Sequence, residues 1–492
     1  MTMLYSTQGT ITFPIKAGNT LKIKNISGTE TVSGSTASRE DASLSIGSGY
    51  VVYGPQASDA TLSLSTSGQV DYEIVAGDVT PSTSALIQVN QFGQGVVDSN
   101  LKVAISNSAG AFLNFKKSNT PVLRAGLAGA FANDFRTLII AAGDSSFSGS
   151  YADNNALVNC RHRAWPKFLC DMLTNAGYTA DENWVMSAGA AAAPGLTTLA
   201  ALAAYDIRFS YGTSPTFLNN YPGLGGQYGA HLGTDAVNGW VKNTARKAFD
   251  TVDTLMMRAS GTGTIDVLDQ ADVVAGTVNT TGANGALFST TTLPANSTAV
   301  KLRSKGTNCV WYGMGTRVAA KPGIEFCNAG IHGISLAYFN TDPNQGGINF
   351  AGPRNSMNAM FTAATKNILM LPLDYNGVNS SGLTLEQAKQ GLRNLVATAR
   401  AFTNPPEIYI VGYTNLVAGP AGLNFDTFMD SMINVAINEL DLPVIDQRPL
   451  MFSSADAKNY GLMAVDGLHN RAGGQAMTAK LVFDAFMYAR TF

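Results

Sequence analysis

The chain has 492 residues, of which 45% are hydrophobic and 13% are charged, and its formal net charge at pH 7 is −2. This composition supports a sizeable core and excludes the basic surface that binds nucleic acid or an anionic membrane. No apolar run reaches about 18 residues, so no transmembrane helix is predicted. The start, MTMLYSTQGT, lacks the pattern of a signal peptide. Abundant Gly, Ser and Thr are typical of polar, β-rich extracellular or virion proteins.

Residues 1–80 have the pattern of a small all-β module that is structural or attaches the protein to a particle. Short apolar segments alternate with turn clusters, as expected for antiparallel strands; they are TITFPI, LKIKNI, YVVYG and VDYEIVAG. Residues 81–134 are less regular and contain Pro81, Pro121 and several glycines. We interpret this stretch as a linker or neck.

Residues 135–204 and 323–492 alternate between strand and helix patterns, which predicts an α/β domain with a parallel sheet covered on both faces. Helices are expected at 156–177, 354–366, 384–402, 424–440 and 473–490, and strands at 136–142, 323–330, 367–373, 406–413 and 442–446. The stretch 205–322 breaks this rhythm with strand-like segments and Gly, Asn and Thr turns. It is predicted to be an inserted β-sandwich.

The four cysteines do not follow a metal-binding spacing and are too few for a disulfide framework. We expect buried free thiols at Cys160, Cys170, Cys309 and Cys327. The sequence predicts no metal site and no cofactor.

The first α/β strand, in RTLIIAAGDSSFSG, ends at Gly143-Asp144-Ser145. These are ordinary turn residues, so the stretch can be a simple strand end. Alternatively, it holds Ser145 at the carboxyl end of a strand, where open parallel sheets bind their ligands. A serine nucleophile requires a base, so the histidines decide between these readings.

Only four histidines are present. His162 lies in a predicted helix and His231 in the insertion, whereas His332 and His469 follow α/β elements. His469 has Asp466 three residues before it, and a carboxylate so placed can orient an imidazole base. Taken alone, this pair can equally be a capped turn with a polar loop histidine. His332 is the alternative base.

Two further turns follow predicted strands. Residues 328–333, NAGIHG, contain glycines that can expose a backbone N–H donor. Residues 374–377, DYNG, offer the side-chain amide of Asn376. Either segment can instead be a plain strand-to-helix turn. The Gly-x-Ser-x-Gly signature of other serine hydrolases is absent from the chain.

Together these segments resemble the four conserved blocks of the SGNH (GDSL-type) hydrolase family, in order and in strand context. The four blocks are Gly143-Asp144-Ser145, Asn328 to Gly333, Asp374 to Gly377, and Asp466 to His469. The third block departs from the family's Gly-x-Asn-Asp, because Asp374 stands at its glycine and Gly377 at its final aspartate. Ser146 replaces the usual leucine of the first block. Ser187-Ala188-Gly189 is an alternative second block.

The resemblance implies a flavodoxin-like, three-layer hydrolase domain covering 136–204 and 323–492. It implies that Ser145 attacks an ester carbonyl, that His469 takes the proton and that Asp466 orients His469. The oxyanion would be stabilised by the N–H groups of Ser145 and Gly330 and by the Asn376 amide.

The architecture also resembles bacteriophage tail proteins that carry an esterase domain. This looser resemblance implies a virion protein acting outside the host cell, often a homotrimer, joined to other tail proteins through its N-terminal module. The expected activity is removal of O-acetyl groups from a bacterial surface polysaccharide. Alternatives are a lipid esterase or thioesterase, and a receptor-binding adhesin with an inactive hydrolase fold.

Four residues are predicted to contact substrate: Asp144, His332, Trp240 and Trp311. The two tryptophans lie in the insertion with several tyrosines, and aromatic rings can stack on sugars. The alternative is that these rings fill the core of the sandwich.

Overall fold

The computed structural model describes residues 6–15, 17, 19–25, 30–33, 50–53, 60–76, 88–89, 95–96, 111–153, 157–187, 196–218, 221–340, 352–414, 416, 419–450 and 453–490. The chain divides into two units, Met1–Ser106 and Asn107–Phe492, and each is described by itself.

The first unit contains a five-stranded antiparallel sheet in the order β1-β5-β2-β4, with β3 also paired to β5. Its strands are β1 (Ser6–Ile15), β2 (Asn19–Asn25), β3 (Glu30–Ser33), β4 (Tyr50–Tyr53) and β5 (Ala60–Ala76). The four segments that alternation marked as strands overlap β1, β2, β4 and the second part of β5, whereas β3 and residues 60–69 of β5 were not predicted. Two short strands, β6 (Gln88–Val89) and β7 (Gly95–Val96), pair with each other.

The second unit is built on a seven-stranded sheet in the order β10-β20-β9-β21-β22-β23-β8. Its strands are β8 (Phe112–Leu113), β9 (Arg136–Ala141), β10 (Ala180–Asp181), β20 (Ile324–Asn328), β21 (Thr365–Leu371), β22 (Glu407–Val411) and β23 (Val444–Ile445). All pairs are parallel except that of β23 with β8. Without the two edge strands, the five central strands have the 2-1-3-4-5 order of flavodoxin-like sheets. The predicted α/β class and parallel sheet are confirmed.

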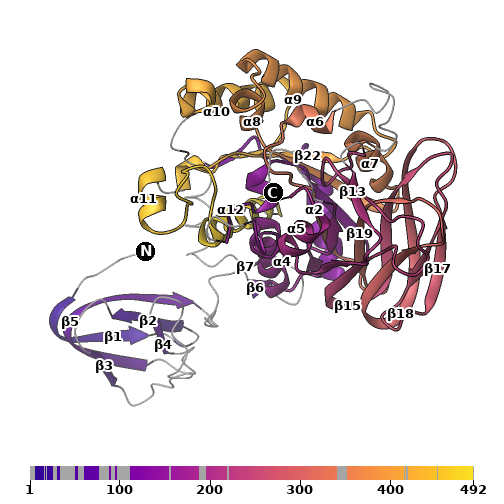
Figure 1. The fold of residues 1–492 in the computed structure, drawn as a ribbon. Helices are drawn as coiled ribbons and strands as arrows, with labels where there is room; N and C mark the ends of the chain where they lie inside the picture. Colours follow the sequence, from indigo (N-terminus) through magenta and orange to yellow (C-terminus); the bar gives the residue numbers. More distant parts are fainter. Residues whose placement is uncertain are drawn as a thin grey trace. The chain divides into compact units, whose positions relative to one another are not determined.

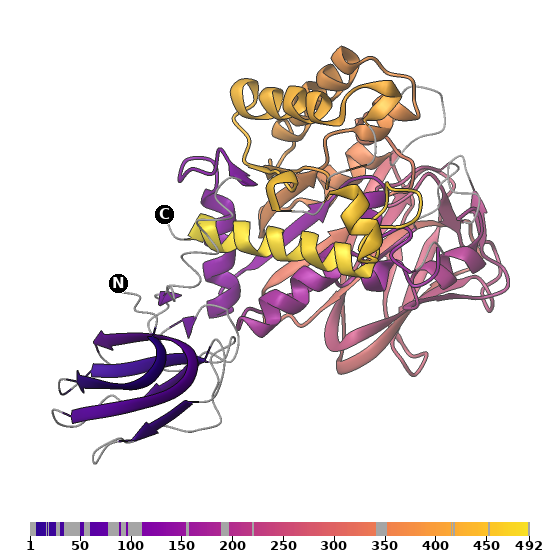
Figure 2. The same cartoon turned by 90° about the vertical axis from the view of Figure 1, so that its left-hand side faces the viewer.

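Helices cover both faces of this sheet, as Figures 1 and 2 show. One layer holds α2 (Pro121–Ala132), α4 (Trp165–Asn175) and α12 (Ala472–Arg490), which pack together. The other layer holds α6 (Leu336–Phe339), α7 (Pro353–Met360), α8 (Tyr375–Asn379), α9 (Leu385–Arg400) and α10 (Phe425–Asn434). The other helices are α3 (Ser145–Ser148), η2 (Arg161–Arg163), α5 (Leu199–Tyr205), η3 (Pro420–Gly422), η4 (Val435–Glu439), η5 (Arg448–Leu450) and α11 (Ser454–Asn459).

Local signals explain where these helices begin. Pro166 lies in the first turn of α4, where its missing N–H costs nothing, so α4 is shorter than the helix predicted over 156–177. A capping box between Thr384 and Gln387 begins α9. The helix predicted over 354–366 ends early at Met360, because Thr365 already belongs to β21.

A nine-stranded antiparallel sheet extends from residue 184 to residue 317. Its strands are β11 (Trp184–Met186), β12 (Phe209–Tyr211), β13 (Thr216–Leu218), β14 (Gly229–His231), β15 (Trp240–Arg258), β16 (Thr264–Leu268), β17 (Val274–Asn279), β18 (Gly285–Ser304) and β19 (Val310–Arg317). The two long strands, β15 and β18, pair along most of their length and shift register near Phe249. Such bulges bend a sheet, and the strands connect into one sheet rather than two (Figure 1).

Two predicted boundaries differ from the structure. The predicted linker of residues 81–134 overlaps the α/β unit, because β8 pairs with β23 and α2 packs against the sheet. The predicted insertion of residues 205–322 begins too late, because β11 already pairs with β19. Both errors involve strands of two or three residues, which are too short to show alternation. The first error also includes the helix α2, whose Pro121, Gly126 and Gly129 are typical of a linker.

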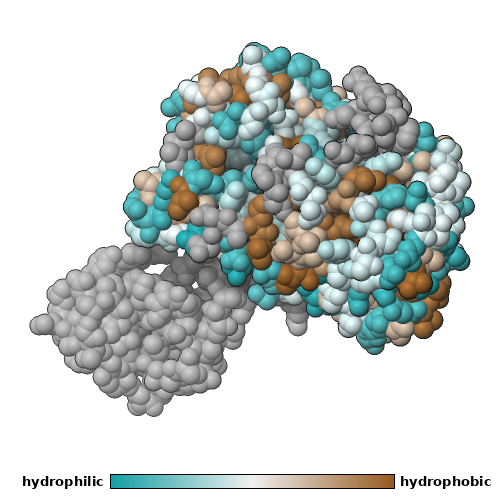
Figure 3. Space-filling view, viewed as in Figure 1, coloured by the Kyte–Doolittle hydropathy of each residue, from teal (hydrophilic) through white to brown (hydrophobic). Residues whose placement is uncertain are grey.

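The core of the second unit is apolar, and all four cysteines are buried free thiols, as predicted. On the face seen in Figure 3, apolar residues are exposed in small separate groups among polar ones. Among the helices of the described residues, none combines the length and the hydropathy needed to cross a bilayer.

Candidate active site

The polar turns singled out in the sequence lie at the carboxyl ends of adjacent strands. The turn after β9 carries Ser145, the turn after β20 carries Gly330 and His332, and the turn after β21 carries Asp374 and Asn376. The strand order reverses at β9, and open parallel sheets bind ligands at such a switch point. The fold therefore brings three of the four predicted blocks to one edge.

Ser145 is partly exposed as the first residue of α3. Helix geometry leaves the first N–H groups without partners. The N–H of Ser146 donates to the side chain of Asp144, and those of Phe147 and Ser148 donate to its carbonyl. Among the described residues, the N–H of Ser145 has no partner, which leaves it available to an oxyanion.

Asp144 is buried, with 4% of its surface exposed, and both carboxylate oxygens are occupied. Oδ1 accepts from Ser146 N and Oγ at 2.9 and 2.6 Å, and Oδ2 accepts from the Tyr413 hydroxyl at 2.7 Å. The predicted substrate contact of Asp144 is therefore wrong for this structure. Asp144 holds the turn that presents Ser145. Tyr413 was not singled out from the sequence; the only signal for it was its position just after the strand β22.

His469 and Asp466 form the predicted pair just before α12. His469 Nδ1 lies 2.6 Å from Asp466 Oδ2, while Oδ1 accepts from the backbone N–H groups of Leu468 and His469. Burial acts to raise the pKa of Asp466, but these hydrogen bonds outweigh it and lower the pKa to about 2. The carboxylate is therefore ionised when it orients the 13%-exposed imidazole.

Helix α12 ties this pair to the nucleophile turn. The N–H of Ala472 donates to the carbonyl of Ala152 at 3.0 Å, and Gln475 Nε2 donates to the carbonyl of Ser146 at 3.3 Å. The Ser145 hydroxyl and the His469 imidazole are not hydrogen-bonded to each other here. In unliganded sites such contacts are often long and tighten with substrate.

Gly330 packs directly under α3. A Cβ there would lie 2.4 Å from Ser148 N, so only glycine fits. Its N–H, predicted as a free oxyanion donor, instead donates to Asn328 Oδ1 at 3.1 Å, and its carbonyl accepts from Arg161 Nη2. An oxyanion would have to share this N–H with Asn328 or displace it.

Asn376 lies in the first turn of α8 and is partly buried. Its Nδ2 donates one hydrogen to Ile334 O at 3.3 Å, and the amide has a second hydrogen to offer. The predicted amide donor is thus compatible with the structure.

Asp374 caps α8 with a φ of 60°, the left-handed conformation that favours glycine and that aspartate tolerates. Its Oδ1 accepts from the N–H groups of Leu336 and Gly377, and its buried Oδ2 has no partner. Burial and the nearby Asp144 raise the pKa of Asp374 to about 7.

Two rings flank the candidate base. The ring of His332 stacks on that of His469 at 5.5 Å and 15°, and the ring of Tyr151 lies 4.6 Å from His469 and 5.7 Å from His332. Burial and His469 lower the pKa of His332 to about 4. His332 lies beside the predicted base, without a carboxylate of its own, and sequence reasoning missed Tyr151 entirely.

The two predicted tryptophans differ. Trp311 is completely buried and stacks on Phe209 at 5.4 Å, so its predicted substrate contact is wrong and the alternative, a core ring, holds. Trp240 begins β15 with its ring under Lys301, and its sugar contact stays a prediction. Ser187, in the alternative second block, follows β11 and donates to the Tyr228 carbonyl.

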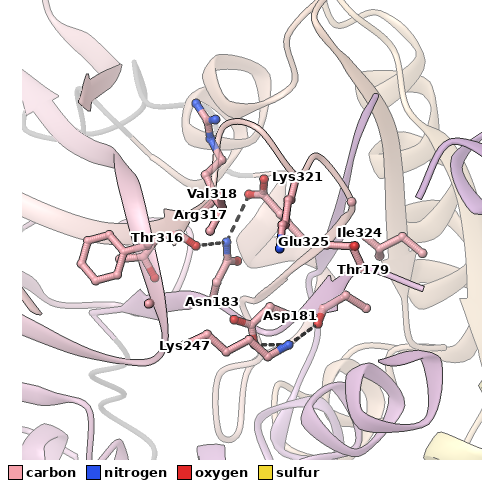
Figure 4. A pocket seen from close by; sticks show the side chains of 14 residues that line it. Thr179, Asp181, Asn183, Lys247, Thr316, Arg317, Val318, Lys321, Ile324 and Glu325 are labelled. Atoms are coloured by element: carbon pink, nitrogen blue, oxygen red, sulfur yellow. Dashed lines mark hydrogen bonds and ion pairs between the residues drawn. The ribbon is translucent and has the colours of Figure 1, made fainter. Parts of the chain in front are cut away.

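A cavity of about 170 Å³ lies at the opposite, amino end of β20, between the two sheets (Figure 4). Asn183 projects into it and donates to Thr316 O and Glu325 Oε2. Glu325 is also held by Arg136 at 2.6 and 2.7 Å, and Arg136 and Arg317 both bind Asp253. This network is self-contained and contains neither a histidine nor a serine.

Within the ranges that the structure describes, no three His, Cys, Asp or Glu side chains gather as a metal site would require.

No family model matches the chain, and no curated protein matches it. Among solved structures, one described as a peptidoglycan O-acetylesterase in action is similar with a TM-score of 0.57 and 15% identity, over 77% of this chain and 99% of that one. A family two carbohydrate esterase from Clostridium thermocellum in complex with cellohexaose has a TM-score of 0.26 and 10% identity, over 56% and 97% of the two chains. A carbohydrate acetylesterase family member from Sinorhizobium meliloti has a TM-score of 0.23 and 18% identity, over 34% and 81%.

The first of these likenesses shows that the chain has the mixed α/β fold of that O-acetylesterase.

Proposed function

We propose that this protein is an SGNH-type serine esterase that removes O-acetyl groups from a bacterial polysaccharide. The observation that carries the proposal is the 2.6 Å contact between His469 Nδ1 and Asp466 Oδ2, at the sheet edge that also presents Ser145. Three of the four segments that resemble the family's blocks follow β9, β20 and β21, and the ring of His469 in the fourth stacks on that of His332. A similar fold belongs to a protein described as a peptidoglycan O-acetylesterase.

The reaction assigns each group a role. Ser145 Oγ attacks the acetyl carbonyl while His469 takes the hydroxyl proton, and Asp466 stabilises the imidazolium formed. The Ser145 N–H and the second hydrogen of the Asn376 amide stabilise the oxyanion. His469 then protonates the leaving sugar oxygen, giving an acetyl-enzyme. A water, deprotonated by His469, attacks this ester and releases acetate and free Ser145.

The product distinguishes this reaction from cleavage of the glycan. The constellation at this edge provides a nucleophile, a base and oxyanion donors, and Asp466 is committed to His469. We therefore expect acetate release from an O-acetylated bacterial polysaccharide without shortening of the chain, measured by an acetate assay and size-exclusion chromatography. Shortening without acetate would show that the reaction is glycosidic and that the proposal is wrong.

Two other functions have their own tests. A lipid esterase or thioesterase would prefer long acyl chains, so a p-nitrophenyl ester series from acetate to decanoate separates it from an acetylesterase. An inactive adhesin would bind polysaccharide but hydrolyse none of these esters. Trp240→Ala tests whether the nine-stranded sheet contributes to sugar binding. If it does, the variant should have a raised KM for polysaccharide and an unchanged KM for p-nitrophenyl acetate.

We also propose a setting, a bacteriophage tail protein that acts at the host surface as a homotrimer attached through residues 1–80. The support is the β-rich N-terminal sequence and the polar composition. Light scattering after size-exclusion chromatography should give a mass three times that of the 51.6-kDa chain. A monomeric mass would contradict the trimer.

A further inference from the structure

Three aromatic rings meet at the candidate base. His469 contacts His332 on one side and Tyr151 on another, and Tyr151 also reaches His332, so each ring touches the other two. Tyr151 belongs to neither the family's blocks nor the hydrogen-bonded pair of His469 and Asp466. It lies on the segment that follows the nucleophile helix, so its backbone is tied to Ser145.

The backbone at Tyr151 is strained. Its φ of 62° lies in the left-handed region, which bulky L-residues rarely adopt. Neighbouring hydrogen bonds hold it there, since Ser150 N donates to Ser145 O at 3.2 Å and Ala152 N donates to Gly149 O at 3.0 Å. Strain of this kind persists where the surrounding structure imposes it, and it concentrates at functional sites. A glycine would adopt this conformation freely, so the aromatic ring is what a glycine at this position would lack.

We propose that Tyr151 is a positioning residue for the catalytic base, whose ring, together with that of His332, holds the plane of the His469 imidazole and faces the imidazolium formed during catalysis. This inference rests on the proposed function. The centroid separation of 4.6 Å lies within the range over which a cation is attracted to an aromatic ring. The tyrosine hydroxyl has no part in this interaction.

His332 is suited to the second side because it stays uncharged. Its Nδ1 is buried without a partner, and burial keeps its pKa near 4, so no second positive charge stands beside His469 at neutral pH. Among the described residues, three titratable groups face the His469 imidazole: Asp466 from its own loop, His332 from the turn after β20 and Tyr151 from the turn after α3.

The test compares Tyr151→Phe, which keeps the ring, with Tyr151→Gly, which keeps the left-handed backbone and loses the ring. With p-nitrophenyl acetate, the phenylalanine variant should retain the wild-type kcat. The glycine variant should lose roughly 2- to 30-fold in kcat, with KM changed less than twofold. Its Tm should be unchanged or higher, because the strain is relieved.

A second readout does not depend on turnover. With four histidines in the chain, their ring signals can be assigned by single substitutions and titrated by NMR. The midpoint of His469 should fall by about half a pH unit in Tyr151→Gly and stay unchanged in Tyr151→Phe. Asn296→Gly is the matched control, because Asn296 is exposed and has a φ of 62° far along the chain in β18. It should change neither kcat nor the His469 midpoint.

Three results would overturn the inference. They are a Tyr151→Gly variant with wild-type kcat and His469 midpoint, a Tyr151→Phe variant as impaired as the glycine variant, and a loss confined to KM for polysaccharide, which would make Tyr151 a sugar-stacking surface. Each of these results overturns the inference only when the wild-type protein hydrolyses p-nitrophenyl acetate. An inactive wild type would instead reject the proposed function.

Discussion

The two ends of β20 differ in how their polar groups are satisfied. At the amino end, Glu325 and Asp253 are buried but bound by Arg136 and Arg317. At the carboxyl end, the Ser145 N–H and the buried Nδ1 of His332 have no partner. Native proteins pair nearly all buried polar groups, so under the proposed function we expect the groups left unpaired beside His469 and Ser145 to be completed by a bound substrate. Two buried oxygens at the amino end, Asn183 Oδ1 and Thr137 Oγ1 opposite Ile324, also have no partner among the described residues and are exceptions to this contrast.

The largest effects should come from the carboxyl end. Ser145→Ala and His469→Ala should each lower kcat for p-nitrophenyl acetate by roughly 10³- to 10⁶-fold, because each removes a group that acts in the bond-making step. The free energy of unfolding should change little. Substantial hydrolysis by Ser145→Ala would show that another residue is the nucleophile, and full activity of His469→Ala would assign the base to His332.

The orienting carboxylate should matter less than the base. Asp466→Asn keeps the shape but not the charge, and should lower kcat by about 10²- to 10⁴-fold. Steady-state kinetics at pH 8 measures this loss. A variant as slow as His469→Ala would mean that the asparagine disturbs the loop, which the circular dichroism spectrum and the Tm would reveal.

At the amino end the same comparison predicts a loss of stability without a loss of chemistry. Arg136→Met removes a partner of both Glu325 and Asp253, which leaves buried carboxylates under-paired and should destabilise the fold by about 3–5 kcal/mol. Urea unfolding measures the change. Arg258→Met, at an exposed arginine, is the control and should stay within about 0.5 kcal/mol. A folded Arg136→Met with normal stability but low kcat would break the contrast between the ends.

Asp374, which follows β21 at the carboxyl end of the sheet, should make the free energy of unfolding depend on pH. Its pKa is raised to about 7 in the folded protein, against about 3.9 in an unfolded chain. The folded state therefore binds the proton of Asp374 more tightly than the unfolded state does. The resulting contribution to the free energy of unfolding is present below about pH 4 and is lost as the pH rises to about 7. Asp374→Asn should remove the loss, so wild type should fall by on the order of 3 kcal/mol relative to the variant between pH 4 and pH 8. Parallel curves for the two proteins would show that Asp374 ionises normally.

The smallest effect is expected at the mouth of the amino-end cavity. Lys321 is exposed there, and Lys321→Met should change the free energy of unfolding by less than about 0.5 kcal/mol and leave kcat unchanged (Figure 4). A clear fall in kcat would mean that this end also serves the reaction.

The sequence predicted the parallel sheet and the position of Ser145 after its first long strand, because long apolar strands show their ends clearly. His469 was located differently, by Asp466 three residues before it. RTLIIA is followed by Ala142 and then Gly143, and the strand containing NILML is followed by Pro372, Leu373 and then Asp374. Strands as short as β8 and β11 carry no period, so the edge of the nine-stranded sheet was misplaced. The start of the α/β unit was misplaced for the same reason and because α2 begins at Pro121 and contains two glycines, which is typical of a linker.

Side-chain contacts could not be predicted in the same way. That Asn328 takes the N–H of Gly330, or that Tyr413 takes the second oxygen of Asp144, depends on rotamers set by residues far along the chain. Tyr151 reaches His469 only because α12 returns to the turn after α3. The sequence marked the residues with reactive atoms but not those that position them.

The place of β9 in the sheet has a consequence for synthesis on the ribosome. β9 is an interior strand, yet both of its neighbours, β20 and β21, come after the nine-stranded sheet. Roughly 180 residues separate Ala141 from Ile324, about 10–40 s of translation at typical rates. During that interval the apolar strand β9 has emerged from the ribosome but has no neighbouring strand to pair with. The nascent chain should therefore depend on chaperones most strongly before residue 324 emerges, and least once β21 has closed the other side.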